Sequence, residues 1–405
     1  MKSSFFCLTL STLSIGLLAC GTPNIIDNDA DVARKESEIV TPTNMAMLVA
    51  QNVVGQAEAT RLAQVFAAAR FGRSAPVITS TDVQLDELTG DPSIYVINFQ
   101  GGGFVLVAAD KRQAPVLAYS DTDHFDAQAV ASTQAPEGVR GFMLHARAQT
   151  HDIRLGATAP VSNAQVFDRF TDQLSGSATT AGGPTGDFQV DPDNCTGSYA
   201  HTYELNFPMQ WAQGCGWNAA VPTANGGPCG HAVAGCVAVA VGQVMKYYRV
   251  PGGIPWASMS DVAPTFAASQ VLSNAGALVG MDYGADASGA DLEDVPSLFR
   301  FYHYSTSVRY TEDFYEQIVL ELQAGRPVIM KGSPDCDFLG FQTCSGHAWV
   351  VTGVYDSYNC STGTGGRHYK MNWGWNGDFN GWYISLDPAG RNYNYHQGVV
   401  LGISG

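Results

Sequence analysis

The sequence is poor in charged residues, and positive charge is the scarcest. Asp, Glu, Lys and Arg make up only 14% of the 405 residues, and 37 acidic against 21 basic residues leave a formal net charge of −16. Because an acidic surface repels phosphate groups, nucleic acid is not expected as a partner. The hydrophobic share of 45% is enough for a sizeable core, and the length favours two domains.

Long apolar runs are also scarce, and the one that stands out lies at the N-terminus. Lys2 precedes an apolar stretch from residue 5 to 18, which is shorter than the roughly 20 residues of a membrane-spanning helix. We expect residues 1–19 to be a lipoprotein-type signal peptide, because small residues before Cys20 suit cleavage there and lipidation of its thiol. An ordinary secretory signal with an incidental cysteine is the alternative. The expected protein is exported, and is either lipid-anchored at a bacterial cell envelope or secreted.

The cysteine count is odd once these N-terminal positions are set aside. Of nine cysteines, Cys7 would leave with the signal and Cys20 would carry lipid, so seven remain. These are Cys195, Cys215, Cys229, Cys236, Cys336, Cys344 and Cys360. In an oxidising compartment six of them can form three disulfides, which leaves one free thiol as a candidate for chemistry.

The N-terminal third predicts a small, compact module of one helix and a strand meander. The Ala-rich segment 44–71 has apolar residues at helical spacing and predicts a helix with a break at Gly55. Runs of apolar and aromatic residues predict strands at 94–99, 104–108 and 115–119. We assign residues 41–154 to this module.

Low-complexity segments separate the expected parts of the chain. Residues 20–40 are polar and uneven in composition, and suit a tether. Residues 155–187 are rich in Ala, Ser, Thr and Gly and predict a flexible linker, where proteolytic processing tends to occur. Residues 188–405 hold the seven remaining cysteines and all seven tryptophans, and form the second expected domain.

One segment predicts a strong helix that begins at a cysteine. Apolar residues at offsets 0, 3, 4, 7, 8 and 11 from Val237 form a helical stripe, and Pro251 ends the pattern. Cys236 therefore lies at the helix N-terminus, where the helix dipole lowers a thiol pKa by roughly one unit. A thiolate at neutral pH needs more than this, so a histidine is expected close to Cys236.

His347 is the best candidate for that histidine. Gly346 and His347 open an apolar strand, and the next strand carries Asn372, which could orient the ring, as could an indole. Alone, Cys236 would more often be a buried small residue or half of a disulfide. The order of cysteine, histidine and asparagine favours a nucleophile, a base and an orienting group. Upstream, the side-chain amide of Gln213 and the backbone N–H of Cys236 suit an oxyanion hole.

At these residues the sequence resembles the streptopain (C10) family of papain-like cysteine peptidases. Residues 234–248 look like the nucleophile helix of the family, 346–348 like its histidine strand, and 372–375 like its Asn-Trp-Gly-Trp signature. Residues 281–290 resemble a block that borders the substrate cleft in the family. Residues 103–120 look like part of the family's propeptide.

The resemblance implies an α+β fold, in which a papain-like catalytic domain with a helical half and an antiparallel β half follows a small α+β propeptide domain. It implies a cysteine endopeptidase that needs no cofactor or metal, cleaves proteins or peptides with an apolar P2 residue, and is inhibited by its own propeptide. By matching motif, Cys236 is the nucleophile, His347 the general base and acid, and Gln213 the oxyanion-hole residue. The supporting residues are Asn372, Trp373 and Trp375.

The sequence departs from the family in two places. The loop from Gln213 to Asn218 differs from the family's pattern, and six cysteines are additional. Beside the resemblance, their expected role is bridging, with Cys236 as the free thiol. The expected pairs are Cys215–Cys229, Cys336–Cys344 and Cys195–Cys360, and the sequence leaves other connectivities open. A metal site at Cys344 and His347, or at Cys229 and His231, is the alternative, although neither spacing is a standard zinc pair.

Two other functions share this scaffold. A surface adhesion or binding protein with a dead site is disfavoured because nucleophile, base and glutamine are all present. A papain-like acyltransferase is disfavoured by the propeptide match and by the lack of a calcium-type acidic loop. The sequence therefore predicts an exported cysteine peptidase precursor.

Overall fold

The structure is a computed structural model that describes residues 51–86, 89–132, 134–155, 167, 198–333, 346–359, 364–384 and 395–405. The predicted signal peptide, the lipidation site Cys20 and the tether lie outside these residues, as does nearly all of the linker. Cys195, Cys336, Cys344 and Cys360 also lie outside them. Over the described residues, we find no helix with both the length and the apolar character that crossing a membrane requires.

The N-terminal segment, residues 51–155, packs two main helices against a four-stranded antiparallel meander. Helix α2 (Gln56–Arg70) begins directly after Gly55, where the sequence predicted a break. The strands are β1 (Ile78–Leu85), β2 (Pro92–Phe99), β3 (Phe104–Ala108) and β4 (Val116–Ser120). The helices α3 (Ala127–Ala131) and α4 (Glu137–Arg154) follow. The three predicted strands are confirmed to within a few residues, whereas β1 and α4 were not predicted.

The C-terminal part, residues 198–405, combines a helical region with a larger antiparallel sheet. Its helices are α6 (Cys236–Tyr248), α7 (Phe266–Leu278), α8 (Val295–Phe301) and α9 (Tyr315–Gln323), with short 3-10 turns η2 (Pro228–Gly230), η3 (Trp256–Ser258) and η4 (Leu292–Asp294). Its strands are β5 (Ser198–Glu204), β6 (Arg309–Thr311), β7 (Val328–Ser333), β8 (His347–Asn359), β9 (Thr364–Asn372), β10 (Gly381–Ile384) and β11 (Tyr395–Leu401). This helical half and β half confirm the predicted α+β class.

Helix α6 confirms the predicted apolar stripe and its start at Cys236. It ends at Tyr248, where Arg249 adopts a left-handed backbone conformation with φ of 56° ahead of Pro251. Lys246 lies in the last turn, where a cation suits the helix dipole. Its side chain is buried, and its ammonium donates to the carbonyls of Trp256 at 2.5 Å and Met259 at 3.0 Å. This side chain therefore ties the end of α6 to the turn η3.

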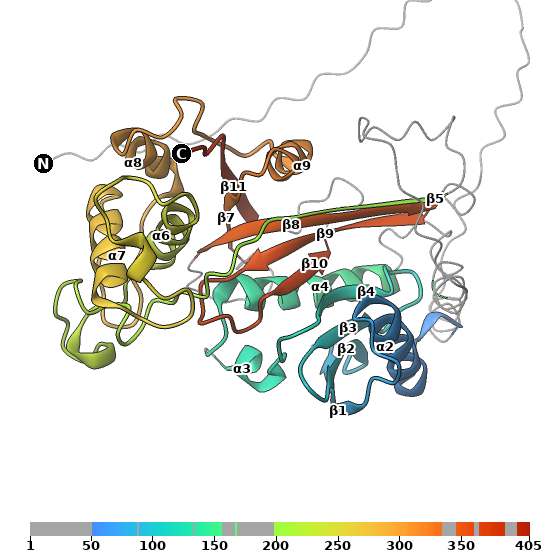
Figure 1. Ribbon diagram of the computed structural model, residues 1–405. Coiled ribbons are helices and arrows are strands. Elements are labelled where there is room, and N and C mark those ends of the chain that lie inside the picture. The colour runs from blue at the N-terminus through green and yellow to red at the C-terminus, as the bar shows by residue number, and fades with distance from the viewer. Residues whose placement is uncertain are drawn as a thin grey trace, which may run out of the picture. The chain divides into compact units, whose positions relative to one another are not determined.

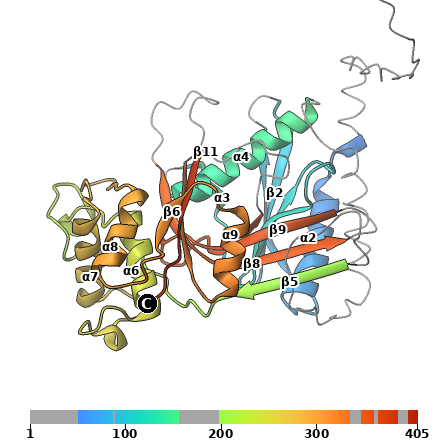
Figure 2. The same cartoon turned by 90° about the horizontal axis from the view of Figure 1, so that it is seen from above.

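The two parts of the chain share one sheet. The strand order is β1-β2-β3-β4-β10-β9-β8-β7-β11-β6, with β5 paired to β8, so β4 of the N-terminal segment lies beside β10. One hydrophobic core joins Leu62 and Leu106 to Trp373 and Tyr383 across this seam. A second core lies between α6, α7, α8 and the other face of the sheet. Figures 1 and 2 show these helices together beside one end of the sheet. The N-terminal segment is thus part of a common sheet and core, and the sequence alone predicted only a separate compact module.

Aromatic side chains cover the seam between β4 and β10. Trp382 pairs with Tyr119, and their rings stack with centroids 6.1 Å apart. His368 of β9 is buried against the same strand, with Nε2 at 3.1 Å from the carbonyl of Val116. Burial lowers the pKa of His368 to about 4, so the ring is neutral at pH 7. The seam therefore buries a polar ring and its acceptor without a net charge.

The seam predicts a strong effect of adding one methyl group at Gly381. A Cβ there would lie 2.7 Å from the carbonyl oxygen of Tyr119 and 3.2 Å from the Phe104 ring. We expect Gly381→Ala to force β4 and β10 apart and to lower the free energy of unfolding of the full chain by about 1–3 kcal/mol. Differential scanning calorimetry measures this. The matched control is Gly366→Ala on β9, where the nearest atoms to an added Cβ lie at 3.7 and 3.9 Å. Equal melting temperatures of the two variants would contradict the close packing of β4 against β10.

Candidate active site

The thiol of Cys236 lies at the junction between α6 and β8. Gly235 precedes it with φ of 90°, and a Cβ on Gly235 would lie 2.6 Å from the sulfur of Met281, so the chain enters the helix through glycine. Cys236 is a free, half-buried cysteine. Burial raises the pKa of its thiol, while a hydrogen bond from the backbone N–H of Ala348 acts in the opposite direction. The sulfur of Cys236 therefore lies within hydrogen-bonding distance of Ala348, the residue directly after His347.

His347 is the first residue of β8, and only 3% of it is exposed. Its Nε2 lies 2.8 Å from the backbone carbonyl oxygen of Trp373. Because a carbonyl only accepts hydrogen bonds, Nε2 carries the proton in the neutral ring, and Nδ1 is left to accept one. Burial lowers the pKa of His347 to about 4, and the carbonyl of Trp373 opposes that shift. The ring is thus neutral at pH 7 in this structure.

Three indoles surround the His347 ring. Trp349 lies nearly parallel to it at 6.2 Å, Trp373 is tilted at 6.4 Å, and Trp375 meets it edge-on at 6.1 Å between centroids. The rings of Trp349 and Trp373 also contact each other at 4.9 Å. This aromatic packing, together with the carbonyl of Trp373, fixes the plane of the imidazole. Of the two orienting groups that the sequence suggested, the structure places the indoles next to the ring.

Asn372 bonds to the neighbouring backbone. Its side-chain Nδ2 donates to the carbonyl of Met209 at 2.6 Å, and its Oδ1 accepts from the N–H of Gly374 at 3.1 Å. The same Oδ1 accepts from the side chain of Gln243 at 3.3 Å. Asn372 therefore supports the turn that carries Trp373 and Trp375.

Gln213 is held beside the start of α6. Its backbone carbonyl accepts from the N–H of Ala234 at 3.0 Å, two residues before Cys236, and the residue is 9% exposed. A disulfide joins Cys215 to Cys229 across this loop and confirms the predicted pair. The structure thus brings Gln213, Cys236 and His347 into one region, although they are separated by 23 and 111 positions in the chain.

The disulfide removes one of the metal-site alternatives. Cys229 is bonded to Cys215, so it cannot supply a thiolate to zinc, and Nδ1 of His231 lies 2.8 Å from the carbonyl of Val221. The other alternative involves Cys344, which lies outside the described residues. Within the part of the chain that is described, we find no cluster of three His, Cys, Asp or Glu residues suited to a metal ion.

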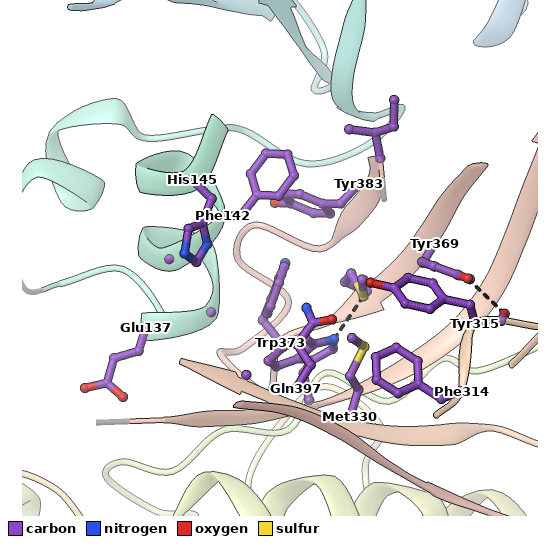
Figure 3. Close-up of a pocket in the computed structure, with 16 residues that line it drawn as sticks. Glu137, Phe142, His145, Phe314, Tyr315, Met330, Tyr369, Trp373, Tyr383 and Gln397 are labelled. Atoms are coloured by element: carbon purple, nitrogen blue, oxygen red, sulfur yellow. Dashed lines mark hydrogen bonds between the residues drawn. The ribbon is translucent and has the colours of Figure 1, made fainter. Parts of the chain in front are cut away.

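The start of helix α4 lies over the candidate site. A Cβ on Gly138 would overlap the Trp373 indole, with Cε3 at 2.9 Å, and would lie 3.3 Å from Cδ2 of His347. The negative charge of Glu137 contributes to the raised pKa of the Cys236 thiol. Figure 3 shows Glu137 at the end of α4 with Trp373 close to the helix. The N-terminal segment therefore covers the imidazole and disfavours the thiolate electrostatically.

A small cavity of about 60 Å³ continues from this contact between α4 and the sheet. Its walls are mostly aromatic side chains and methionines, among them Phe142 on α4 and Met330, Trp349 and Tyr383 on the sheet. Nε1 of Trp349 donates to the sulfur of Met371 at 3.0 Å, so the buried indole N–H has a partner. The cavity belongs to the interface between the N-terminal segment and the sheet.

Sequence reasoning missed several groups at this site. The carbonyl of Trp373 has no side-chain signal, because every residue carries a backbone carbonyl. Glu137 and Gly138 lie on a helix that was not predicted, and Gln243 appeared only as one residue of the helical motif. Trp349 directly follows the Gly-His-Ala segment, and its position two residues after His347 on a strand could have suggested that both side chains share a face.

A thiol at a helix start, an imidazole with a fixed tautomer and a nearby glutamine are typical of thiol hydrolases of the papain-like class. The helical half and the antiparallel β half, with the thiol on the first and the imidazole on the second, agree with this class. The additional N-terminal segment that covers the site points to a precursor.

Comparison with known proteins agrees. Residues 211–265 and 254–383 match the model of the Peptidase C10 family, and residues 45–137 match that of the Spi protease inhibitor. The chain is 25% identical to streptopain of Streptococcus pyogenes over 385 residues, which covers 80% of this chain and 85% of that protein. It is 26% identical over 350 residues to the thiol protease/hemagglutinin PrtT of Porphyromonas gingivalis, with 74% of this chain and 36% of that protein covered.

A solved structure has the same fold. A fragment of prointerpain A from Prevotella intermedia matches with a TM-score of 0.51 and 22% identity, over 80% of this chain and 99% of the fragment. The part of the chain from 211 to 383 is similar to the Peptidase C10 family, and the chain is a cysteine endopeptidase with an N-terminal segment similar to a protease inhibitor.

The two pKa shifts predict a slow thiol in the full chain. A raised thiol pKa and an imidazole pKa of about 4 leave both groups neutral between pH 5 and 7. We expect iodoacetamide to alkylate Cys236 at pH 6.5 at least about tenfold faster once limited proteolysis has removed residues before 188, because one pKa unit is a tenfold change in thiolate. Mass spectrometry of the Cys236 peptide measures the rate. Equal rates in the intact and the cleaved chain would show that the cover does not control the thiol.

Proposed function

We propose that this chain is the precursor of an exported cysteine endopeptidase in which Cys236 is the nucleophile, His347 the general base and acid, and Gln213 an oxyanion-hole residue. The observation that carries the proposal is the hydrogen bond from Nε2 of His347 to the carbonyl of Trp373. It leaves Nδ1 as the proton acceptor, on a residue whose neighbour Ala348 contacts the Cys236 sulfur. A thiol and a base with these assignments are what nucleophilic catalysis requires.

The first half-reaction forms an acyl-enzyme. Nδ1 of His347 takes the thiol proton, and the thiolate of Cys236 attacks the carbonyl carbon of the scissile peptide bond. The negative charge that develops on the carbonyl oxygen is stabilised by the side-chain amide of Gln213 and by the N–H of Cys236, which has no intrahelical acceptor at the first helical position. The C–N bond then breaks, and the imidazolium gives its proton to the leaving amine.

The second half-reaction restores the thiol. His347 takes a proton from water, and the resulting hydroxide attacks the thioester carbonyl of the acyl-enzyme. The same oxyanion site stabilises the second tetrahedral intermediate. The C–S bond breaks, the carboxylic acid product leaves, and the imidazolium returns its proton to the Cys236 thiolate, which restores the thiol and the neutral ring. Atoms and charges balance without a metal or an organic cofactor.

The substrates in this proposal are proteins or peptides, and an apolar residue at P2 is inferred from family resemblance. Export through the signal peptide at 1–19 is supported by the sequence pattern there. We further propose that Cys20 is lipidated and anchors the precursor at the bacterial cell envelope, unless processing releases it. Because the chain carries a net negative charge, it attracts proteins with basic patches and repels nucleic acids.

Latency in this proposal comes from residues 41–154 acting as an intramolecular inhibitor of a peptidase domain at 188–405. It is supported by the match of residues 45–137 to a protease inhibitor and by the position of Gly138 against Trp373 and His347. Cleavage within 155–187 would let β4 separate from β10 and α4 leave the site. The imidazole then regains solvent, and its pKa rises from about 4 towards its ordinary range, so that an imidazolium can form.

Substitution of the three proposed catalytic residues tests the chemistry. We expect Cys236→Ala and His347→Ala to abolish self-cleavage and casein digestion. Gln213→Ala is expected to lower kcat by roughly 10²–10³-fold with less effect on KM, because an oxyanion contact is made mainly in the transition state. The assays use the full chain under reducing conditions, with casein and with a peptide substrate.

Each outcome of this test has a separate meaning. A wild-type chain that neither matures nor digests casein, even after limited proteolysis, would remove the peptidase proposal. Undiminished digestion by Cys236→Ala would leave a peptidase but remove the site assignment. Transfer of an acyl group to an added amine in preference to hydrolysis would favour an acyltransferase.

A methyl group at Gly138 is expected to release latency. The added Cβ would overlap the Trp373 indole. Alanine favours the helical conformation of α4 by about 1 kcal/mol over glycine, so the substitution should weaken the contact between α4 and the site without destabilising the helix itself. We expect Gly138→Ala to mature several-fold faster than wild type and to alkylate at Cys236 before cleavage. Gel analysis over time measures maturation.

Gly55→Ala is the matched control for Gly138→Ala. Gly55 lies in the same N-terminal segment, and a Cβ there would have no heavy atom within 4 Å. It should mature at the wild-type rate. If Gly138→Ala matures no faster than Gly55→Ala, the start of α4 does not hold the enzyme inactive.

A further inference from the structure

A buried glutamine lies on the same face of α6 as the nucleophile. Gln243 follows Cys236 by seven residues, which is two helical turns, so both side chains leave the helix on one side. Gln243 is completely buried. A buried amide is costly unless each polar atom has a partner, so its contacts indicate what it holds in place.

One branch of its contacts reaches the segment that leads to Gln213. Oε1 of Gln243 accepts from the backbone N–H of Trp211 at 3.3 Å, and its Nε2 donates to Oδ1 of Asn372 at 3.3 Å. Asn372 in turn donates from Nδ2 to the carbonyl of Met209 at 2.6 Å. The two amides therefore hold the backbone of Trp211 and Met209, two and four residues before Gln213, against the nucleophile helix.

The other branch reaches the His347 ring through a single peptide group. Oδ1 of Asn372 accepts from the N–H of Gly374 at 3.1 Å. That N–H belongs to the same peptide as the carbonyl of Trp373, which accepts from Nε2 of His347 at 2.8 Å. A continuous chain of hydrogen bonds thus runs from Gln243 through Asn372 and the peptide between residues 373 and 374 to the imidazole.

The direction of every hydrogen bond in this chain is fixed by backbone groups. The N–H of Trp211 can only donate, which requires Oε1 of Gln243 to face it and Nε2 to face Asn372. The N–H of Gly374 likewise requires Oδ1 of Asn372, and the carbonyl of Met209 requires Nδ2. Neither amide can be reversed without leaving buried groups unpaired.

Gly374 is adapted to this arrangement. It has φ of 70°, and a Cβ there would lie 3.0 Å from Cγ1 of Val239 on α6 and 3.9 Å from Nε2 of Gln243. Only glycine lets the turn after Trp373 approach the nucleophile helix this closely without strain. The peptide between residues 373 and 374 is thus held by packing as well as by hydrogen bonds.

We propose that Gln243 and Asn372 are positioning residues that act on His347 through the peptide between Trp373 and Gly374, and on Gln213 through the preceding backbone. An acceptor on the N–H of a peptide polarises its carbonyl, because hydrogen bonds in a chain strengthen one another. The carbonyl of Trp373 then binds Nε2–H more strongly, above all when the ring is an imidazolium. This deepens, and rests on, the proposed peptidase function.

Removal of either amide should change the chemistry of the ring. We expect Gln243→Met and Asn372→Leu to lower kcat about 10–100-fold with KM within about threefold. A weaker carbonyl stabilises the imidazolium less, so the alkaline limb of kcat/KM should move down by about 0.5–1 pH unit. The full chain is matured by limited proteolysis with an added protease, and rates are normalised to active sites titrated with an irreversible thiol inhibitor.

Two further variants separate positioning from a loss of stability. Asn372→Asp keeps an acceptor for the N–H of Gly374 and adds negative charge, so its alkaline limb should lie at or above that of wild type. Ser269→Ala removes another buried acceptor, which serves the N–H of Ala220 at 2.6 Å and lies outside the chain of bonds to His347. It should lower the melting temperature and leave the alkaline limb unmoved.

The pH dependence of Cys236 alkylation in the matured chain provides a readout that needs no turnover. If Gln243→Met and Asn372→Leu keep the wild-type limb in both assays, or if Ser269→Ala shifts it equally, the positioning role is overturned. If wild type hydrolyses no peptide, the proposed function fails, while a shifted alkylation profile would still support the link to His347. Should Asn372→Leu not fold, Gln243→Met and the opposite shift of Asn372→Asp still decide the matter.

Discussion

The hydrogen bond between Nε2 of His347 and the backbone carbonyl of Trp373 is the interaction on which the rest of the site depends. It is buried, so little water competes with it, and it fixes the tautomer that leaves Nδ1 free to accept a proton. The carbonyl acceptor carries no charge, so the protonation state of the His347 ring depends strongly on the surroundings of the ring. In the covered site the pKa is about 4, and exposure to solvent raises it.

Trp373 links the orientation of His347 to the N-terminal segment that covers the site. Its carbonyl holds His347, while its indole lies directly against Gly138 at the start of α4. The N-terminal segment does not lie across the site as a loose strap, because β4 extends the catalytic sheet at β10 and shares its hydrophobic core. Separation of the two parts must therefore break strand pairing and expose aromatic surface, which requires more free energy than a local fluctuation.

Much of the fold follows from local patterns, and the exceptions have physical causes. The sequence predicted α6 because its apolar residues repeat at helical spacing, and three strands of the meander because they are short runs of apolar and aromatic residues. It did not predict β1, since most of its residues, such as Thr81 and Asp82, are polar and only partly buried. It did not predict α4 either, because Gly138 and Gly141 lower helix propensity, and packing of Val139 and Met143 in the core compensates.

The sequence by itself determined the position of Cys236 at a helix start, the position of His347 at a strand start and the odd thiol among the cysteines. These are local features, set by periodicity, by helix-ending residues and by a simple count. Only the tertiary structure decided that a carbonyl of Trp373 orients the ring, that Gln243 and Asn372 reach it through one peptide, and that β4 pairs with β10. Backbone groups are chemically the same at every residue, so which of them meet is decided only when the chain folds.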